Sequence, residues 1–200
     1  MLKSGLCCIR TQNVVYPVLP DEDEETTVEP STEAPTEAPT EAPSPCLDGW
    51  TLLIRDPNSR CIMVIINPNT TPTDADALCT SANAEAVPSG VYSTEEYSII
   101  SALTKVANNG NDALLILGAM RTSLCEGEEI TATCTQLTSF TWTDGTPGIA
   151  GFAAENWAEN RPNNGGKIQD YLIVNTATNT IDDVEAAREL DGVVCGMPAM

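Results

Sequence analysis

The stretch "WAENRPNN", residues 157–164, brings an arginine, a proline and asparagines together in one polar loop. Asparagine amides beside a proline are typical of a ligand or metal site, where a carboxylate is the usual neighbour. This loop instead carries Arg161, in a chain with 29 acidic side chains and only 9 lysines and arginines. A guanidinium donates hydrogen bonds and has no lone pair for a metal. Arg161 is therefore the residue whose role most needs an explanation.

The charge and composition exclude several classes of function. The net charge of −20 repels nucleic acids and anionic membranes, so we predict no nucleic-acid partner. The chain contains no histidine, which removes the commonest general base and the commonest zinc ligand. Serine-histidine hydrolysis is excluded for the same reason. Carboxylate chemistry and hard cations such as calcium remain open.

The cysteines predict disulfide bonds rather than a metal site. Those after residue 45 are widely spaced, with no C-x-x-C pair: Cys46, Cys61, Cys79, Cys125, Cys134 and Cys195. This pattern favours a disulfide framework in an oxidising, extracellular compartment, although spacing alone leaves the pairings open. No apolar run is long enough to span a membrane, so we predict no transmembrane segment. The protein is expected to be secreted or associated with the cell surface.

The N-terminal part divides into two segments. Residues 1–20 make a poor or truncated signal sequence, because the apolar run that begins at Gly5 ends at Arg10. Cys7 and Cys8 are consistent with an intermolecular bridge, a lipidated site or a remnant of the signal. Residues 21–45 contain three copies of T-E-A-P and are expected to be a disordered, extended acidic stalk. Its threonines beside prolines suit a mucin-like, O-glycosylated stalk or an unmodified linker equally.

Residues 46–200 are predicted to form one domain of the α+β class. Apolar runs predict strands at residues 50–55, 61–66, 113–120, 171–176 and 191–197. Helical spacing predicts helices at residues 73–87 and 93–106. In the second helix, Ser93 and Glu96 have the spacing of a capping box, and Tyr97, Ile100, Leu103 and Val106 share one face. Residues 125–167 are rich in Gly, Asn, Thr and Pro and form a long irregular region of the kind that is usually functional.

A series of motifs in a fixed order carries a resemblance to a known family. The motifs are "CLDGW", "ALC", "STEEYSII", "LLILGA", "FTWTDG", a tryptophan four residues before "RPNN", "QDYLIV", "IDDV" and "VVCG". Together they resemble the C-type lectin-like domain, and "CEGEEITATC" with "TIDDV" and "CGMPA" resembles its nematode branch. The resemblance covers residue 46 to the last residue. It implies two helices, N- and C-terminal strands lying together, and a long loop region.

The resemblance also implies the disulfide pairing. It pairs Cys46 with Cys61, Cys79 with Cys195, and Cys125 with Cys134. A further bridge of the family is missing, because Tyr171 occupies one of its positions and Ala186 or Ala187 the other. That bridge normally fixes the loop that carries the ligand site. We therefore expect this loop to be more mobile than in a typical relative.

The resemblance further implies a set of ligand-binding positions. In calcium-dependent members, a cis proline directs neighbouring side-chain oxygens toward the ion, and sugar hydroxyls complete its shell. The matching metal positions here are Asn163, Gln169, Asp182 and Asp183. Arg161 occupies the first position, where the family has Glu or Gln, and the charge of a guanidinium opposes a dication.

Three interpretations of this loop remain open. Calcium binds weakly with Arg161 swung into solvent; or Arg161 replaces the ion through a bidentate pair with Asp182 or Asp183; or "RPNN" is a plain turn. Calcium is thus a possible but doubtful cofactor.

The expected function is recognition of a ligand without catalysis. The first hypothesis is an extracellular carbohydrate-recognition protein with weakened or lost calcium dependence, which uses Arg161, Asn163, Gln169, Asp182 and Asp183. The alternative is a protein-binding or surface-coat component that no longer binds sugar. The partner is accordingly a glycan or a protein, and the sequence does not indicate an oligomeric state. Trp142 and Trp157 are expected to be anchors of the core and loop.

Overall fold

The computed structural model describes residues 45–56, 58–147 and 153–200. The expected signal segment, and the expected stalk apart from Pro45, lie outside the described residues. Within the described ranges no helix is long and apolar enough to cross a membrane. The elements run in the order β1 (Thr51–Leu53), β2 (Arg60–Thr70), η1 (Pro72–Asp74), α1 (Ala75–Ala82), β3 (Val87–Pro88), α2 (Thr94–Ala107), β4 (Leu114–Arg121), β5 (Phe140–Trp142), α3 (Ala153–Asn156), η2 (Gly165–Lys167), β6 (Tyr171–Asn175), β7 (Thr180–Val184) and β8 (Leu190–Pro198).

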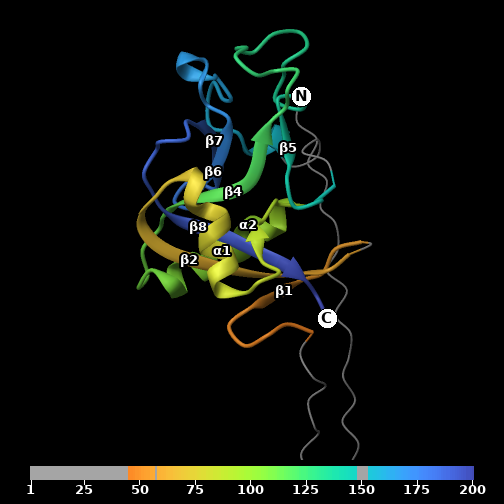
Figure 1. Cartoon of the computed structure of the whole chain (residues 1–200), viewed down its shortest axis with the longest axis vertical. Helices are drawn as coiled ribbons and strands as arrows, with labels where there is room; N and C mark the ends of the chain where they lie inside the picture. The colour runs from red at the N-terminus through yellow and green to blue at the C-terminus, as the bar shows by residue number, and fades with distance from the viewer. Residues whose placement is uncertain (1–44, 57, 148–152) are drawn as a thin grey trace, which may run out of the picture. The chain divides into compact units, whose positions relative to one another are not determined.

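One mixed sheet organises the domain. Its main strand order is β1-β2-β8-β4-β6-β7, with β3 added to β8 and β5 added to β4. The N-terminal strand β2 pairs with the C-terminal strand β8 over most of its length, as predicted. In Figure 1 the loops of residues 122–139 (green) and 157–168 (light blue) extend beyond β4, β6 and β7, whereas β1 and the end of β8 lie at the opposite side of the picture. The sheet therefore presents the long loops at one of its ends.

The two helices cover opposite faces of this sheet. Alternate residues of a strand point to opposite faces, and in β4 Leu115 and Leu117 pack with α2 while Ile116 packs on the side of α1. Tyr97 and Ile100 bring α2 into the first cluster, which also contains the aromatic residues of the loop region, and Cys79 brings α1 into the second. Residues 115–118 of this central strand are fully buried. The α+β prediction is confirmed.

The three predicted disulfides are present. Cys46 joins Cys61, Cys79 joins Cys195, and Cys125 joins Cys134. The second of these connects α1 to β8 across a sequence separation of 116 residues.

Several local predictions need correction. The second strand continues to Thr70 instead of ending at residue 66, because its last part still pairs with Leu190. The first helix is shorter than predicted and spans Ala75–Ala82. Val106 is 82% exposed, since α2 turns it away from the sheet. The expected use of Glu96 in a capping box is also wrong.

Glu96 serves a different purpose. Its carboxylate is buried and receives the Arg55 guanidinium through Nε at 2.7 Å and Nη2 at 2.8 Å. It also accepts a hydrogen bond from the Tyr92 backbone N–H at 2.8 Å. Glu96 thus neutralises the buried Arg55 guanidinium instead of capping the N-terminus of α2, because a buried charge requires a partner.

Candidate functional site

The loop that carries Arg161 is attached to the edge strand β7. Trp157 forms an isolated bridge with Ile181, and the Ala158 N–H donates to the Ile181 carbonyl at 2.9 Å. Trp157 is buried and its ring centroid lies 5.9 Å from that of Phe140. The aromatic ring thus anchors the loop to the core, as predicted for this residue. The Arg161–Pro162 peptide bond is cis.

Arg161 contacts both the loop and the strand. Its Nε lies 3.1 Å from Asp182 Oδ1, and its Nη1 donates to Asn163 Oδ1 at 2.7 Å. The side chains of Arg161 and Asp182 are each 29% exposed, so the pair is partly screened by water. A bidentate pair with Asp182 or Asp183 is one of the three interpretations of this loop. The structure shows a single close approach, to Asp182.

Asp183 lies beneath the loop and is completely buried. Its Oδ1 accepts the Asn163 N–H at 3.0 Å, and its Oδ2 accepts the Asn164 N–H at 2.7 Å. Oδ2 also receives Arg121 Nη2 at 2.8 Å. Both carboxylate oxygens are therefore used to hold the loop, and we call Asp183 and Arg121 the loop lock.

Arg121 is the residue of this site that sequence reasoning missed. It ends β4, and its guanidinium donates to the Gln169 carbonyl from Nε at 2.8 Å and from Nη2 at 2.6 Å. Its Nε also lies 3.4 Å from Asp170 Oδ1, and its Cζ lies 4.4 Å from the centre of the Phe140 ring. Burial lowers the pKa of Arg121, while the charges of Asp183 and Asp170 oppose this shift. A buried cation thus binds the chain at the end of the loop directly and holds Asn163 and Asn164 through Asp183.

Asn164 and Gln136 connect this loop to the neighbouring disulfide finger, residues 122–139. Asn164 is buried in a left-handed conformation that asparagine tolerates. Its side chain accepts the Gln169 N–H at 2.9 Å and donates to the Glu128 carbonyl at 2.7 Å. Gln136 Nε2 donates to the Arg161 carbonyl at 2.7 Å. Greater mobility of the loop stays a prediction, and these contacts oppose it.

The predicted metal ligands do not fit calcium in this arrangement. Asn163 Oδ1 accepts from Arg161 Nη1 and from the Gly165 N–H, which uses both lone pairs of that oxygen. Gln169 Oε1 accepts from the Gly165 N–H as well. Asp183 is occupied by the loop lock. Since calcium requires 6–8 oxygen ligands, it would have to displace these donors and two guanidinium groups.

The pKa of the Asp182 carboxyl is raised above its ordinary value. Burial raises its pKa from 3.8 to about 6; Arg161 lowers this pKa and the charge of Asp183 raises it. Because the folded pKa lies above the ordinary value, the stability that Asp182 contributes is complete below about pH 3.8 and is lost as the pH rises through about 6.

We expect Arg161→Ala to raise the pKa of Asp182 above its wild-type value, because the substitution removes a positive charge that favours the carboxylate. Carboxyl-carbon NMR shifts followed from pH 3 to 8 measure this pKa directly. The control is Lys105→Ala, which removes a positive charge on α2, where the ammonium lies 3.6 Å from Asp112. An Asp182 pKa that falls or stays constant in Arg161→Ala would show that the two charges are not coupled.

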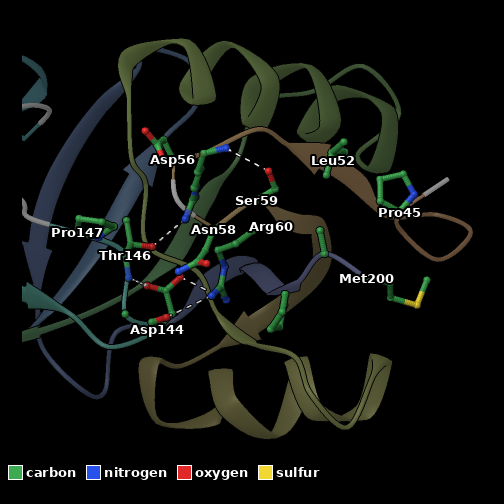
Figure 2. Close-up of a pocket in the computed structure, with 14 residues that line it drawn as sticks. Pro45, Leu52, Asp56, Asn58, Ser59, Arg60, Asp144, Thr146, Pro147 and Met200 are labelled. Atoms are coloured by element: carbon green, nitrogen blue, oxygen red, sulfur yellow. Dashed lines mark hydrogen bonds and ion pairs between the residues drawn. The ribbon is translucent and has the colours of Figure 1, made fainter.

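A large cavity of about 800 Å³ lies among residues that the sequence did not indicate. Figure 2 shows Arg60 directed toward Asp144 on its wall, and Nη1 of Arg60 donates to the Asp144 carbonyl at 3.2 Å. Arg55, also on this wall, donates to Thr146 Oγ1 at 2.8 Å and pairs with Glu96. Arg60 Nη2 also lies 3.4 Å from Asp144 Oδ2, so carboxylates of the protein compensate the charges of both arginines. None of the predicted ligand residues lines this cavity.

Solved structures share this arrangement of sheet, helices and loops. The C-type lectin CEL-I from Cucumaria echinata is 17% identical, with a TM-score of 0.57 over 78% of this chain and 99% of its own. The cow C-type carbohydrate-recognition domain of CD23, solved with a GlcNAc2Man3 oligosaccharide, is 20% identical, with a TM-score of 0.55 over 78% of this chain and 98% of its own. A calcium-independent type II antifreeze protein is 20% identical, with a TM-score of 0.53 over 80% of this chain and 100% of its own.

These likenesses confirm that the chain has the C-type lectin-like fold. At this level of identity they establish the fold and leave the ligand open. No family model matches the chain, and no curated protein matches its sequence.

Proposed function

We propose that the protein is an extracellular carbohydrate-recognition module that binds its ligand without calcium. The observation that carries this proposal is the position of two guanidinium groups: Arg161 approaches Asp182, and Arg121 is hydrogen-bonded to Asp183. They supply at these carboxylates the positive charge that a metal would otherwise provide. A fixed loop can then present a surface to a sugar with no ion as intermediary. The ligand-binding residues proposed here are Arg161, Asn163, Gln169, Asp182 and Asp183.

An extracellular location is consistent with the disulfides that bind the domain together. In this proposal residues 21–45 form an acidic, mucin-like stalk that holds a nematode-type domain, residues 46–200, away from the point of attachment. The charge of the T-E-A-P repeats would keep such a stalk extended, because its glutamates repel one another. A glycan or protein ligand could then reach the domain without hindrance.

The proposal includes no catalysis. A glycosidase of the usual kind needs two carboxyl groups on either side of the scissile bond. Asp182 and Asp183 are neighbours on one strand, and Asp183 is buried with its oxygens occupied. They do not offer that arrangement.

A second candidate is a non-sugar, protein-binding or surface-coat component. It is favoured by the state of the loop acceptors, because the oxygens of Asn163 and Gln169 already accept hydrogen bonds from within the protein. Oxygens used in this way are less available to sugar hydroxyls. The resemblance of the fold to an antifreeze protein described as calcium-independent is compatible with this candidate.

A glycan array probed in calcium and in chelator distinguishes the two candidates. We expect the same glycans to bind equally in both buffers, because no step of the proposed recognition uses the ion. Calorimetric titration with calcium chloride should accordingly show no saturable heat. Chelator-sensitive binding would refute the calcium-independent mechanism, and an array without signal in either buffer would favour the protein-binding candidate.

A further inference from the structure

A second cavity lies beside the loop. It measures about 740 Å³, within the range of sites that bind small molecules. Three segments contribute to its walls: the disulfide finger, the end of the long loop, and the turn after β7. We call it the side groove, and the residues that characterise it are Ser123, Glu126, Lys167, Ile168, Asp170 and Glu185.

The polar side chains of the side groove are available for a ligand. Glu126, Lys167 and Glu185 make no side-chain hydrogen bond or ion pair with any residue that the structure describes, and neither does the Ser123 hydroxyl. In contrast, the oxygens of Asn163 and Gln169 accept hydrogen bonds from the loop itself. The groove therefore offers hydrogen-bond acceptors and donors that are free, whereas the acceptors at Asn163 and Gln169 are already occupied.

Asp170 connects the side groove to the loop lock. Its Oδ1 has no hydrogen-bond partner among the described residues and faces Arg121 Nε at 3.4 Å. Its side chain is 35% exposed. Arg121 thus holds the buried Oδ1 of Asp170 in place, and the remaining, exposed part of this carboxylate can accept a hydrogen bond from a ligand.

The groove also has an apolar surface. Ile168 is 59% exposed, and Ala186 and Ala187 form part of the wall. Both alanines are exposed, and their short side chains leave room in the groove. An exposed aliphatic surface beside polar groups suits the C–H face of a sugar ring, because contact between the two removes apolar area from water.

We propose that the side groove is the site where the protein binds a sugar ring that carries no acidic group. This inference rests on the proposed carbohydrate recognition and adds a neighbouring surface to the five loop and strand residues named above. Glu126, Asp170 and Glu185 accept hydrogen bonds from sugar hydroxyls, while Lys167 and Ser123 donate to ring or hydroxyl oxygens. Three carboxylates against one ammonium repel uronic, sialic and sulfated sugars, and favour neutral or amine-bearing ones.

The test compares groove variants of the full chain on defined oligosaccharides. The probes are neutral oligomers of mannose, galactose and N-acetylglucosamine, an amine-bearing glucosamine oligomer, and a sulfated oligosaccharide, each titrated by calorimetry. For the neutral or amine-bearing probe that binds wild type, we expect Glu126→Gln/Glu185→Gln to bind about tenfold more weakly or worse, because hydrogen bonds to charged groups are lost. Ala187→Trp, which fills the groove from an exposed position, should abolish binding.

Two controls make the test specific. Glu129→Gln removes an exposed carboxylate of the same finger that does not line the groove, and it should bind as wild type does. Thermal unfolding shows that each variant is folded. Neutral-sugar binding that survives both groove substitutions would overturn the side groove and leave carbohydrate recognition intact. A preference for the sulfated probe would also overturn it, and no binding to any probe would refute both proposals together.

Discussion

Replacing Arg121 with alanine is expected to lower the free energy of unfolding by about 3–5 kcal/mol, the usual cost of leaving a buried charge without its partner. The side chains of Arg121 and Asp183 are 3% and 0% exposed, so water cannot take the place of the guanidinium. Asp183 would keep only the N–H groups of Asn163 and Asn164. The contacts of Arg121 with the Gln169 carbonyl would be lost as well.

Urea unfolding followed by circular dichroism measures this effect. Arg161→Ala is the matched control, because it removes the other guanidinium of the site from a pair whose side chains are 29% exposed. It should cost about 1 kcal/mol or less. A double-mutant cycle with Asp183→Ala separates the pair from the other contacts of Arg121. Equal losses for Arg121→Ala and Arg161→Ala would contradict the loop lock.

The contrast between these arginines shows what the sequence could predict. Arg161 lies two residues from Asn163 within one motif, and its role could be inferred from local spacing and from the resemblance. Arg121 comes from a different strand and meets Asp183 only because β4, β6 and β7 are neighbours in the sheet. Nothing local links them. The available signal was a charged residue at the end of an apolar strand, which requires a partner if buried.

The fold was more predictable than the site because its determinants are distributed along the whole chain. Motif order placed the helices, the paired terminal strands and all three disulfides correctly. Local errors arose where a tertiary contact overrides a local rule. Glu96 has the spacing of a capping box but pairs with Arg55, because a buried guanidinium competes more strongly for its carboxylate than an exposed helix end.

Asp183 illustrates how one residue type at one position can serve two mechanisms. The resemblance predicts a metal ligand, whereas the structure buries the side chain under backbone N–H groups and a guanidinium. Both arrangements need a carboxylate at this point of β7. The difference lies in the cation that faces it, which is why a motif match alone could not decide the chemistry.

Removing the disulfide between Cys79 and Cys195 is expected to have an effect of similar size. In the chain-entropy model, a loop of this length is worth about 4–5 kcal/mol of the free energy of unfolding. The bridge also joins α1 to β8 within the second core cluster. The variant Cys79→Ala/Cys195→Ala should therefore unfold at much lower urea concentration, and a fraction should be unfolded without denaturant at 37 °C.

The comparison variant Cys125→Ala/Cys134→Ala removes a bridge with a sequence separation of 9 residues, for which the same model gives about 3 kcal/mol. This short bridge closes the disulfide finger, so its loss should also release the two hydrogen bonds between finger and loop, Asn164 to Glu128 and Gln136 to Arg161. Hydrogen exchange separates the two outcomes. Loss of Cys79–Cys195 should speed exchange throughout the sheet, because it acts on global unfolding, whereas loss of Cys125–Cys134 should speed it mainly in the finger and the loop. Uniform acceleration in both variants would mean that the finger is not a separate unit, and that the loop depends on the whole sheet for its position.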